Sequence, residues 1–336
     1  MASNNIKVAI NGFGRIGRSF FRLCLEQKNI KVVAINDPAD TKTLAHLLKY
    51  DSIHGVLNES VEYHNDTIIC DQQKVLVSHE IKLENINWQF AQPDFVLESS
   101  GKFKTSNQLQ NHIKNGAKRC ILSVPPQDDQ IKMVVLGVNE SILKADDKII
   151  SNASCTTNNA APMLNVMHQA LGVQQAYIST IHSYTTDQSL HDSPHKDLRR
   201  ARAATQSIVP TTTGAAKALT KIFPDLSHAI GGCGIRVPVP NGSLTDMTLY
   251  TKQKTNQHEV NQLFKEAAQR SPWKILRYCD DPIVSIDIKN SPYSCIFDSE
   301  MTSVIDGNLI KLLGWYDNER GYSNRLIDLM LKMHSF

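Results

Sequence analysis

The fold is decided by Ile6-Lys7-Val8-Ala9-Ile10-Asn11-Gly12-Phe13-Gly14-Arg15-Ile16-Gly17. The apolar start of this stretch predicts a buried strand, its end is a glycine-rich turn, and Ser19 to Gln27 then has the spacing of a helix. In such a unit the first glycine permits a tight turn, the second lets backbone approach a pyrophosphate, and the third lets the helix pack on the strand. We therefore expect Gly12, Gly14 and Gly17 to form a dinucleotide-binding turn.

Asp37 supports the same prediction and indicates which dinucleotide binds. It follows a second apolar run, Lys31 to Asn36, and stands 20 residues after Gly17. An acidic residue at that distance accepts hydrogen bonds from the adenosine ribose and repels a 2′-phosphate, so NAD is favoured over NADP. The alternative interpretation of Asp37-Pro38 is a turn that opens after a strand.

The first half of the chain continues to alternate short apolar runs with amphipathic segments. This alternation predicts βαβ units and a parallel sheet, which is a Rossmann-type α/β arrangement. The later runs of this half are Asp94 to Glu98, Arg119 to Ser123, Lys132 to Gly137 and Lys148 to Ile150.

The second half is richer in β-type segments separated by turns, which predicts an α+β domain with a mainly antiparallel sheet. Its expected strands are Ala176 to Ser183, Gly234 to Val239, Asp246 to Lys252, Ile283 to Ile288, Ser294 to Phe297 and Ile310 to Trp315. Its expected helices are Thr213 to Ile222 and Gln257 to Gln269, and Tyr322 to Met333 reads as a terminal helix. We expect a nucleotide-binding domain at 1–153, joined by the C-terminal helix 318–336, and a catalytic domain at 154–317.

Composition excludes several classes of protein. The 336 residues are 41% hydrophobic and 21% charged, with a net charge of only +3, which favours neither nucleic acid nor a membrane surface as a partner. The seven cysteines are odd in number and lack Cys-x-x-Cys spacing, so neither a disulfide framework nor a cysteine zinc site is expected, nor any other metal site. The start of the chain lacks the apolar core of a signal peptide, and we expect a cytoplasmic protein.

Cys155 is the candidate nucleophile. It lies in Ser151-Asn152-Ala153-Ser154-Cys155-Thr156-Thr157-Asn158, between an apolar run and a segment with helical spacing. A helix N-terminus stabilises negative charge, and a thiol becomes a good nucleophile when its thiolate is stabilised. An inert buried cysteine is the usual alternative for a single residue of this kind.

Eight stretches of the chain match one known family in order and spacing: Asn11 to Arg18, Leu44 to Asp51, Ser151 to Asn158, Thr180 to Thr185, Asp197 to Ala203, Val209 to Ala218, Arg236 to Pro238 and Trp315 to Ser323. Any single motif is weak, but their order and spacing together are specific. On these stretches the chain resembles, over essentially its whole length, phosphorylating glyceraldehyde-3-phosphate dehydrogenases.

The resemblance implies a covalent mechanism in which Cys155 attacks an aldehyde and His182, 27 residues downstream, acts as the base. Oxidation of the hemithioacetal gives a thioester, and inorganic phosphate releases an acyl phosphate. The resemblance further implies a homotetramer. It divides the substrate's phosphate and the attacking phosphate among Thr185, Arg200, Thr213, the Gly214 amide and Arg236. Ser154 and Thr156, which flank the nucleophile, are expected to contact the substrate.

The cofactor contacts implied by the resemblance add to the glycine turn and Asp37. Asn318 matches the residue that hydrogen-bonds the nicotinamide carboxamide. Arg15 and Ile16 are expected against the pyrophosphate, and the remaining residues expected to line the cofactor cleft are Ser100, Gly101 and Ser123.

Four positions depart from the family pattern. Asn159 replaces a second cysteine that many members carry four residues after the nucleophile, and Ile81 stands where many place an arginine near the adenine. Arg320 replaces a usual aromatic or apolar residue. Ser193, before Pro194, weakens the expected exclusivity for NAD.

Two alternatives remain at this point. Erythrose-4-phosphate dehydrogenase shares the scaffold, although Thr212 to Lys217 fits the glyceraldehyde enzymes better. A redox sensor or nucleic-acid-binding protein on the same scaffold is the alternative of another class, and neither a basic stripe nor an aromatic-rich loop supports it.

Overall fold

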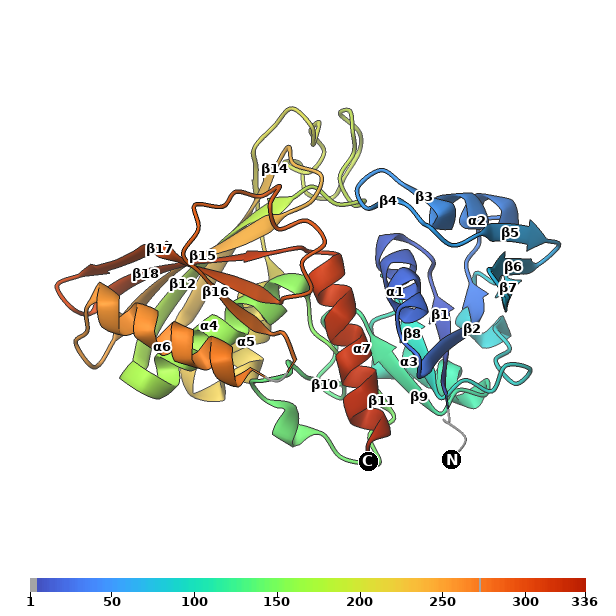
Figure 1. Ribbon diagram of the computed structural model, residues 1–336, viewed down its shortest axis with the longest axis horizontal. Helices are drawn as coiled ribbons and strands as arrows, with labels where there is room; N and C mark the ends of the chain where they lie inside the picture. Colours follow the sequence, from blue (N-terminus) through green and yellow to red (C-terminus); the bar gives the residue numbers. More distant parts are fainter. Residues whose placement is uncertain (1–4, 272) are drawn as a thin grey trace. The chain divides into compact units, whose positions relative to one another are not determined.

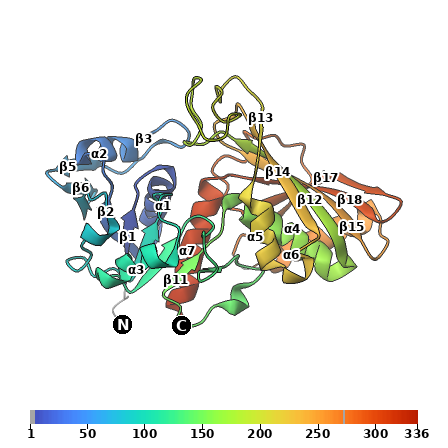
Figure 2. The ribbon, with the colours of Figure 1, turned by 180° about the vertical axis from the view of Figure 1, so that it is seen from behind.

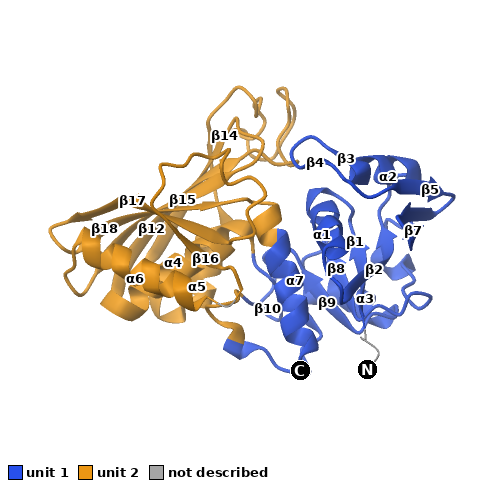
Figure 3. Ribbon diagram, viewed as in Figure 1, with its two compact units in different colours: residues 1–134, 141–153, 323–336 blue, residues 135–140, 154–322 orange. Residues whose placement is uncertain are grey.

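The computed structural model describes residues 5–271 and 273–336, and the chain forms two compact units. Unit 1 comprises Met1–Val134, Ser141–Ala153 and Ser323–Phe336, and unit 2 comprises Val135–Glu140 and Ser154–Tyr322 (Figure 3). The expectation of no signal peptide depends partly on residues 1–4, which lie outside the described residues.

Unit 1 holds a nine-stranded sheet in the order β10-β11-β9-β8-β1-β2-β7-β6-β5 (Figure 1). Neighbours from β10 to β7 pair parallel, whereas β6 and β5 continue the sheet antiparallel. The strands are β1 Ile6–Asn11, β2 Ile30–Asn36, β5 Val61–His64, β6 Thr67–Cys70, β7 Gln73–Ser78, β8 Phe95–Glu98, β9 Arg119–Leu122, β10 Lys132–Met133 and β11 Ile149–Ser151. A separate hairpin pairs β3 Tyr50–Asp51 with β4 Gly55–Val56.

Four helices belong wholly or mainly to unit 1: α1 Arg15–Leu25, α2 Thr41–Lys49, α3 Ser106–Lys114 and α7 Arg320–His334, which enters this unit at Ser323. The centre of the sheet is buried on both sides, so β1 and β8 are almost continuously apolar, as parallel strands between helix layers are. Helix α1 buries Phe20 and Phe21, and α7 buries Leu326 and Met330.

Unit 2 holds a seven-stranded sheet in the order β13-β14-β12-β15-β18-β17-β16, seen from behind in Figure 2. Four pairings are antiparallel, and β12–β14 and β16–β17 are parallel. The strands are β12 Val173–Ser183, β13 Val209–Thr211, β14 Ile230–Val237, β15 Ser243–Thr251, β16 Leu276–Cys279, β17 Cys295–Ile305 and β18 Leu309–Tyr316.

Helices α4 Cys155–Leu171, α5 Gly214–Ile222 and α6 Gln257–Arg270 cover one face of this sheet. Phe264 of α6 stacks on Phe297 of β17 with ring centroids 3.8 Å apart. Along β12, Ile178, Thr180 and His182 are buried on one face, whereas Tyr177, which directly precedes Ile178 and points to the opposite face, is 53% exposed. His182, one residue before the end of the strand, therefore lies on the helix-covered side.

The predicted fold class is confirmed: a Rossmann-type unit with a mainly parallel sheet is joined to a unit with a mainly antiparallel sheet. The strand predicted at Ile283 to Ile288 is wrong. Asp287 accepts a hydrogen bond from the Val284 amide at 2.8 Å and closes a turn there, leaving Val284 and Ile286 exposed. The strand predicted at Lys132 to Gly137 ends at Met133.

Among the described residues, every helix is too short or too polar to cross a bilayer.

Candidate functional site

Cys155 is the first residue of helix α4. Ser154 caps that helix, because its Oγ accepts a hydrogen bond from the Thr157 amide at 3.1 Å. The preceding Ala153 has φ of +54°, a left-handed conformation that turns the chain sharply into the helix. The 17-residue helix therefore begins with the thiol at its positive end.

His182 lies beside the thiol. The separation of Cys155 Sγ from His182 Nε2 is 3.5 Å, although the two residues lie 27 positions apart in sequence. Burial, and then the positive charge of Arg236, lower the pKa of His182 to about 3. The imidazole is therefore neutral near pH 7, and its role as a proton acceptor is the one that this geometry supports.

The second ring nitrogen of His182 faces two groups. Nδ1 lies 2.7 Å from the Ser183 carbonyl oxygen and 2.6 Å from Nη1 of Arg236, which also donates to that carbonyl at 3.1 Å. Only the tautomer with its proton on Nδ1 leaves a lone pair on Nε2 toward the thiol. In that tautomer the Ser183 carbonyl accepts from both His182 and Arg236, and Arg236 Nη1 has to move away from Nδ1, because two donors cannot share the 2.6 Å contact.

Arg236 reaches this position through strand register. It lies on β14 directly opposite His182 on the parallel neighbour β12. Burial raises the pKa of Cys155, while the charge of Arg236 and hydrogen bonds to Thr156 oppose this effect without cancelling it. The ligand-free site therefore holds a thiol with a cation and a neutral base beside it.

Arg200 and Thr185 are linked by Asp187, which the sequence analysis did not single out. Arg200 Nη1 pairs with Asp187 Oδ2 at 2.8 Å, and the Thr185 hydroxyl donates to the other carboxylate oxygen. Burial alone raises the pKa of Asp187, but the Thr185 hydroxyl, Arg236 and Arg200 outweigh it and lower the value. A protein carboxylate therefore stands among the predicted phosphate donors.

Thr213 and Gly214 begin helix α5. The Thr213 hydroxyl caps the helix by accepting from the Ala215 amide at 3.2 Å. A Cβ at Gly214 would have open space within 4 Å, so backbone is accessible there. Accessible amides at a helix N-terminus suit a phosphate.

Asn318 has its amide orientation fixed by its neighbours. Its Oδ1 accepts from the Gly242 amide at 3.2 Å, the Ser183 hydroxyl at 3.0 Å and the Ser243 hydroxyl at 3.2 Å. Because the Gly242 N–H can only donate, this atom must be the oxygen. The amide nitrogen of Asn318 is therefore the atom that can donate a hydrogen bond to a ligand. An acceptor such as a carboxamide oxygen needs a donor of this kind.

In unit 1 the glycine turn that starts at Gly12 joins β1 to helix α1. Gly12 has φ of +91°, and a Cβ there would lie 2.4 Å from the Ser100 amide nitrogen. A Cβ at Gly17 would lie 2.4 Å from the Gly12 carbonyl oxygen, whereas Gly14, the cap of α1, has nothing within 4 Å. Backbone at Gly14 is therefore open to a ligand, and the other two glycines are required by close contact.

Asp37 and Arg15 flank this turn. Asp37 accepts hydrogen bonds from the Phe13 amide at 2.8 Å and the Ala39 amide at 3.0 Å. Arg15 pairs through both terminal nitrogens with Asp51, at 2.8 and 3.1 Å. Its guanidinium is therefore already engaged by a carboxylate of its own unit.

The remaining predicted cofactor residues lie at neighbouring strand ends or on α1. Ser100 donates its amide and hydroxyl to Glu98, Gly101 has φ of +71°, and Ser123 is buried just after β9. Ile16 is half-buried in the first turn of α1.

Tyr316 is another residue that sequence reasoning missed. Its hydroxyl lies 2.9 Å from Thr156 Oγ1, and its ring meets the His182 ring edge to face at 5.9 Å. Burial, and then the nearby Cys155, raise the pKa of Tyr316 well above its usual value. The sequence could have pointed to Tyr316, because it lies between Trp315 and Asn318 in one of the stretches that carry the family resemblance.

Comparison with known proteins agrees with both units. Residues 6–106 match the model of the glyceraldehyde 3-phosphate dehydrogenase NAD-binding domain, and residues 154–318 match its C-terminal domain. The chain is 50% identical over 326 residues to glyceraldehyde-3-phosphate dehydrogenase 2 of Streptomyces avermitilis, covering 96% of this chain and 97% of that protein.

Two similarly named relatives show the same extent of similarity. Glyceraldehyde-3-phosphate dehydrogenase of Borreliella burgdorferi is 46% identical over 98% of this chain and 99% of that protein. Its counterpart of Geobacillus stearothermophilus is 45% identical over 96% of this chain and 97% of that protein. The chain therefore belongs to the glyceraldehyde-3-phosphate dehydrogenase family.

Proposed function

We propose that this chain oxidises glyceraldehyde 3-phosphate with NAD and inorganic phosphate to 1,3-bisphosphoglycerate, a reaction of glycolysis and gluconeogenesis. The observation that carries the proposal is the 3.5 Å approach of Cys155 Sγ to a neutral His182, with Arg236 beside both. A thiol next to a neutral base is the arrangement that addition to an aldehyde requires.

Cys155 and His182 carry the covalent steps. As Sγ forms a bond to the aldehyde carbon, its proton passes to Nε2 of His182, which returns a proton to the former carbonyl oxygen. The neutral imidazole then takes that hydroxyl proton as the hemithioacetal is oxidised to a thioester. NAD, when bound, supplies the hydride acceptor, and the open backbone at Gly14 and the directed amide of Asn318 fit it.

The phosphate groups are held by the cationic and neutral donors around Cys155. Arg236, Arg200, Thr185, Thr213 and the Gly214 amide supply these donors, with Ser154 and Thr156 flanking the thiol. When a phosphate oxygen attacks the thioester carbon, the carbon–sulfur bond breaks and Cys155 recovers its proton from His182. An anion that binds Arg200 has to compete with Asp187, which pairs with it at 2.8 Å.

An NADH-forming assay with glyceraldehyde 3-phosphate, with and without phosphate, tests the proposal. Cys155→Ser should abolish turnover, and His182→Asn should lower kcat by about a hundredfold or more. Asp37→Ala should lower the ratio of kcat/KM for NAD to that for NADP, because the charge that repels a 2′-phosphate is lost. Full turnover by the Cys155 variant would contradict the mechanism. Faster turnover of erythrose 4-phosphate than of glyceraldehyde 3-phosphate would contradict the substrate.

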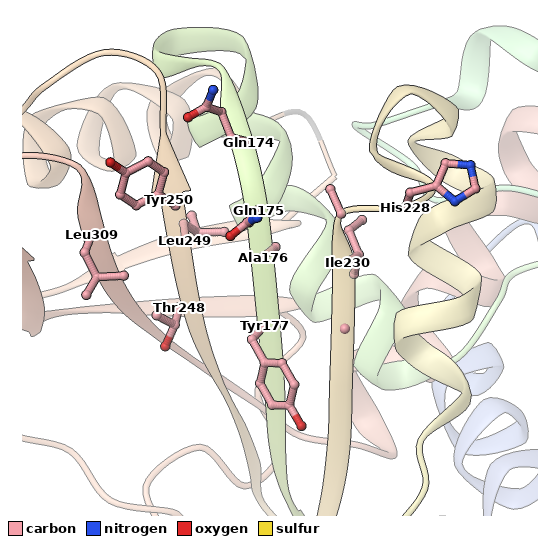
Figure 4. A pocket seen from close by; sticks show the side chains of 12 residues that line it. Gln174, Gln175, Ala176, Tyr177, His228, Ile230, Thr248, Leu249, Tyr250 and Leu309 are labelled. Atoms are coloured by element: carbon pink, nitrogen blue, oxygen red, sulfur yellow. The ribbon is translucent and has the colours of Figure 1, made fainter.

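The active form is a homotetramer whose contacts include the helix-free face of the unit 2 sheet. Tyr177 and Tyr250 are 53% and 46% exposed there, beside a pocket of about 520 Å³ (Figure 4). A sheet face that exposes tyrosine rings among polar side chains such as Gln175 and Thr248 suits a second copy related by two-fold symmetry. Tyr177→Lys should reduce the mass measured by light scattering, whereas Gln269→Lys on α6 should not.

The cytoplasm is the compartment that fits this chemistry. All seven cysteines are free thiols, and a thiol nucleophile persists in a reducing environment. Labelling in intact cells with a thiol reagent that does not cross membranes should leave Cys155 unmodified.

A further inference from the structure

Four neighbouring parallel strands of unit 1 end in polar residues that form one row across the sheet. Glu98 ends β8, Asn11 ends β1, Asn36 ends β2 and Ser78 ends β7, and adjacent members are register partners. Asn11 Nδ2 donates to Glu98 Oε2 at 2.6 Å, Asn36 Nδ2 donates to Asn11 Oδ1 at 2.8 Å, and Ser78 Oγ donates to Asn36 Oδ1 at 2.8 Å. The first three are at most 2% exposed.

The direction of these hydrogen bonds is fixed at one end by backbone. The Glu80 amide donates to Asn36 Oδ1 at 2.9 Å, so that atom is the oxygen and the Asn36 nitrogen faces Asn11. Asn11 then presents its oxygen to Asn36 and its nitrogen to Glu98.

The direction at the other end is fixed by an indole. Trp88 Nε1 donates to His112 Nδ1 at 3.1 Å, so the neutral imidazole carries its proton on Nε2. That N–H lies 3.0 Å from Glu98 Oε2, and His112 is completely buried.

Glu98 therefore receives four donors on two oxygens. Asn11 and His112 donate to Oε2, while the amide and hydroxyl of Ser100 donate to Oε1 at 2.9 and 2.5 Å. A carboxylate, which only accepts, satisfies all four donors. The amide of a glutamine would turn its own N–H groups toward one pair of them.

Three of the four members of the row stand next to a proposed cofactor contact. Asn11 precedes Gly12, Asn36 precedes Asp37, and Glu98 holds Ser100. The Gly12 turn also lies directly against the Ser100 backbone, where a Cβ would come within 2.4 Å. Small shifts of one strand end therefore change the fit of the others.

We propose that Glu98 is a positioning residue for NAD. Through the hydrogen bonds of this row, Glu98 holds the Gly12 turn, Asp37 and the Ser100 turn in the arrangement that binds the cofactor. The inference rests on the cofactor site proposed above. It assigns an effect on cofactor binding to a fully buried carboxylate of unit 1, the unit that does not carry the thiol.

Glu98→Gln is the first test. It should raise KM for NAD about tenfold, because one pair of donors loses its acceptor. KM for the aldehyde and the rate of Cys155 alkylation by iodoacetamide without NAD should stay unchanged. A variant that only melts at lower temperature, with KM for NAD unchanged, would overturn the proposal.

Asn11→Asp and the exchanged pair give a sharper test. Asn11→Asp alone places two carboxylates at the 2.6 Å contact and should also raise KM for NAD. With Glu98→Gln present as well, the new amide nitrogen meets an acceptor, so KM should fall below that of either single variant. Recovery is partial because the His112 donor still lacks its acceptor. If the double variant instead raised KM for NAD by the product of the two single effects, the direction of these hydrogen bonds would have no role in cofactor binding.

Two further variants keep the outcomes separate. Ser78→Ala removes one hydroxyl donor at the β7 end of the row and should raise KM for NAD about twofold. This variant replaces Glu98→Gln as the test if the Glu98 variant does not fold. An unchanged KM there would then overturn the row. Asp37→Ala tests the proposed cofactor site itself. If it changes the preference for NAD over NADP while the row variants leave KM for NAD unchanged, the proposal about the row is wrong and the cofactor site stands. If neither Asp37→Ala nor the row variants have an effect, the proposed cofactor site is wrong.

Discussion

Cys155 is held as a thiol in the ligand-free protein, because burial raises its pKa more than Arg236 and the hydrogen bonds to Thr156 lower it. His182, with a pKa of about 3, is neutral at the same pH. The pair therefore rests as thiol and imidazole rather than as an ion pair, and the proton moves only when an aldehyde is attacked.

The pH dependence of Cys155 alkylation follows from this balance. Because the pKa of the thiol lies above its ordinary value, iodoacetamide should react increasingly fast as pH rises through and beyond about 8.5. Arg236→Gln removes the opposing positive charge and should shift the profile to higher pH. Arg270→Gln, exposed at the end of α6, is the matched control. A shift to lower pH in the Arg236 variant would contradict the assignment.

Asn159 determines the fate of an oxidised Cys155. It occupies the position four residues on, fully buried, with its amide nitrogen donating to the carbonyls of Ser294 and Trp315 at 3.2 and 3.3 Å. Peroxide should convert Cys155 to sulfenic acid with release of water, and then to sulfinic acid, without a local disulfide. Mass spectrometry after peroxide checks this. Asn159→Cys is the comparison variant, and an intrachain Cys155 disulfide in the native protein would refute the expectation.

At the scale of elements, the Arg15–Asp51 pair ties the start of α1 to the β3–β4 hairpin. Burial raises the pKa of Asp51, but the His54 and Ile53 amides and Arg15 outweigh it and lower the value to about 2. With a depressed folded-state pKa, the stabilisation is complete above the unfolded value of about 4 and is lost as pH falls toward 2.

Asp51→Asn should therefore cost about 1–2 kcal/mol of unfolding free energy at pH 7. The difference from the native chain should shrink as pH is lowered from about 4 to 2. Denaturant unfolding at both ends of this range measures it. A difference that grows toward low pH would show that the carboxylate does not act through its charge.

Most strands and helices could be predicted from the sequence, because the spacing of apolar residues within a segment is enough to distinguish a strand from a helix. The antiparallel strands β5 to β7 were missed, and Ile283 to Ile288 looked like a strand although the Asp287 side chain closes a turn within it. The contact of Cys155 with His182 was expected from resemblance. The pairing of Arg236 with His182 depends on register between distant strands, which no local pattern encodes.

At the scale of the whole molecule, the two units carry separable tasks. The cofactor turns and the polar row lie in unit 1, whereas the thiol, its base and the anion donors lie in unit 2. Variants in the row should therefore change cofactor binding without changing thiol reactivity, and variants such as Arg236→Gln should do the reverse.

The central claim is that oxidation proceeds through a thioester on Cys155 that only phosphate releases efficiently. Rapid mixing of enzyme, NAD and glyceraldehyde 3-phosphate without phosphate should give a burst of about one NADH per active chain and then near arrest. Intact-mass analysis of the arrested enzyme should place the acyl group on Cys155. Continuous turnover without phosphate, or an acyl group on another residue, would contradict the account.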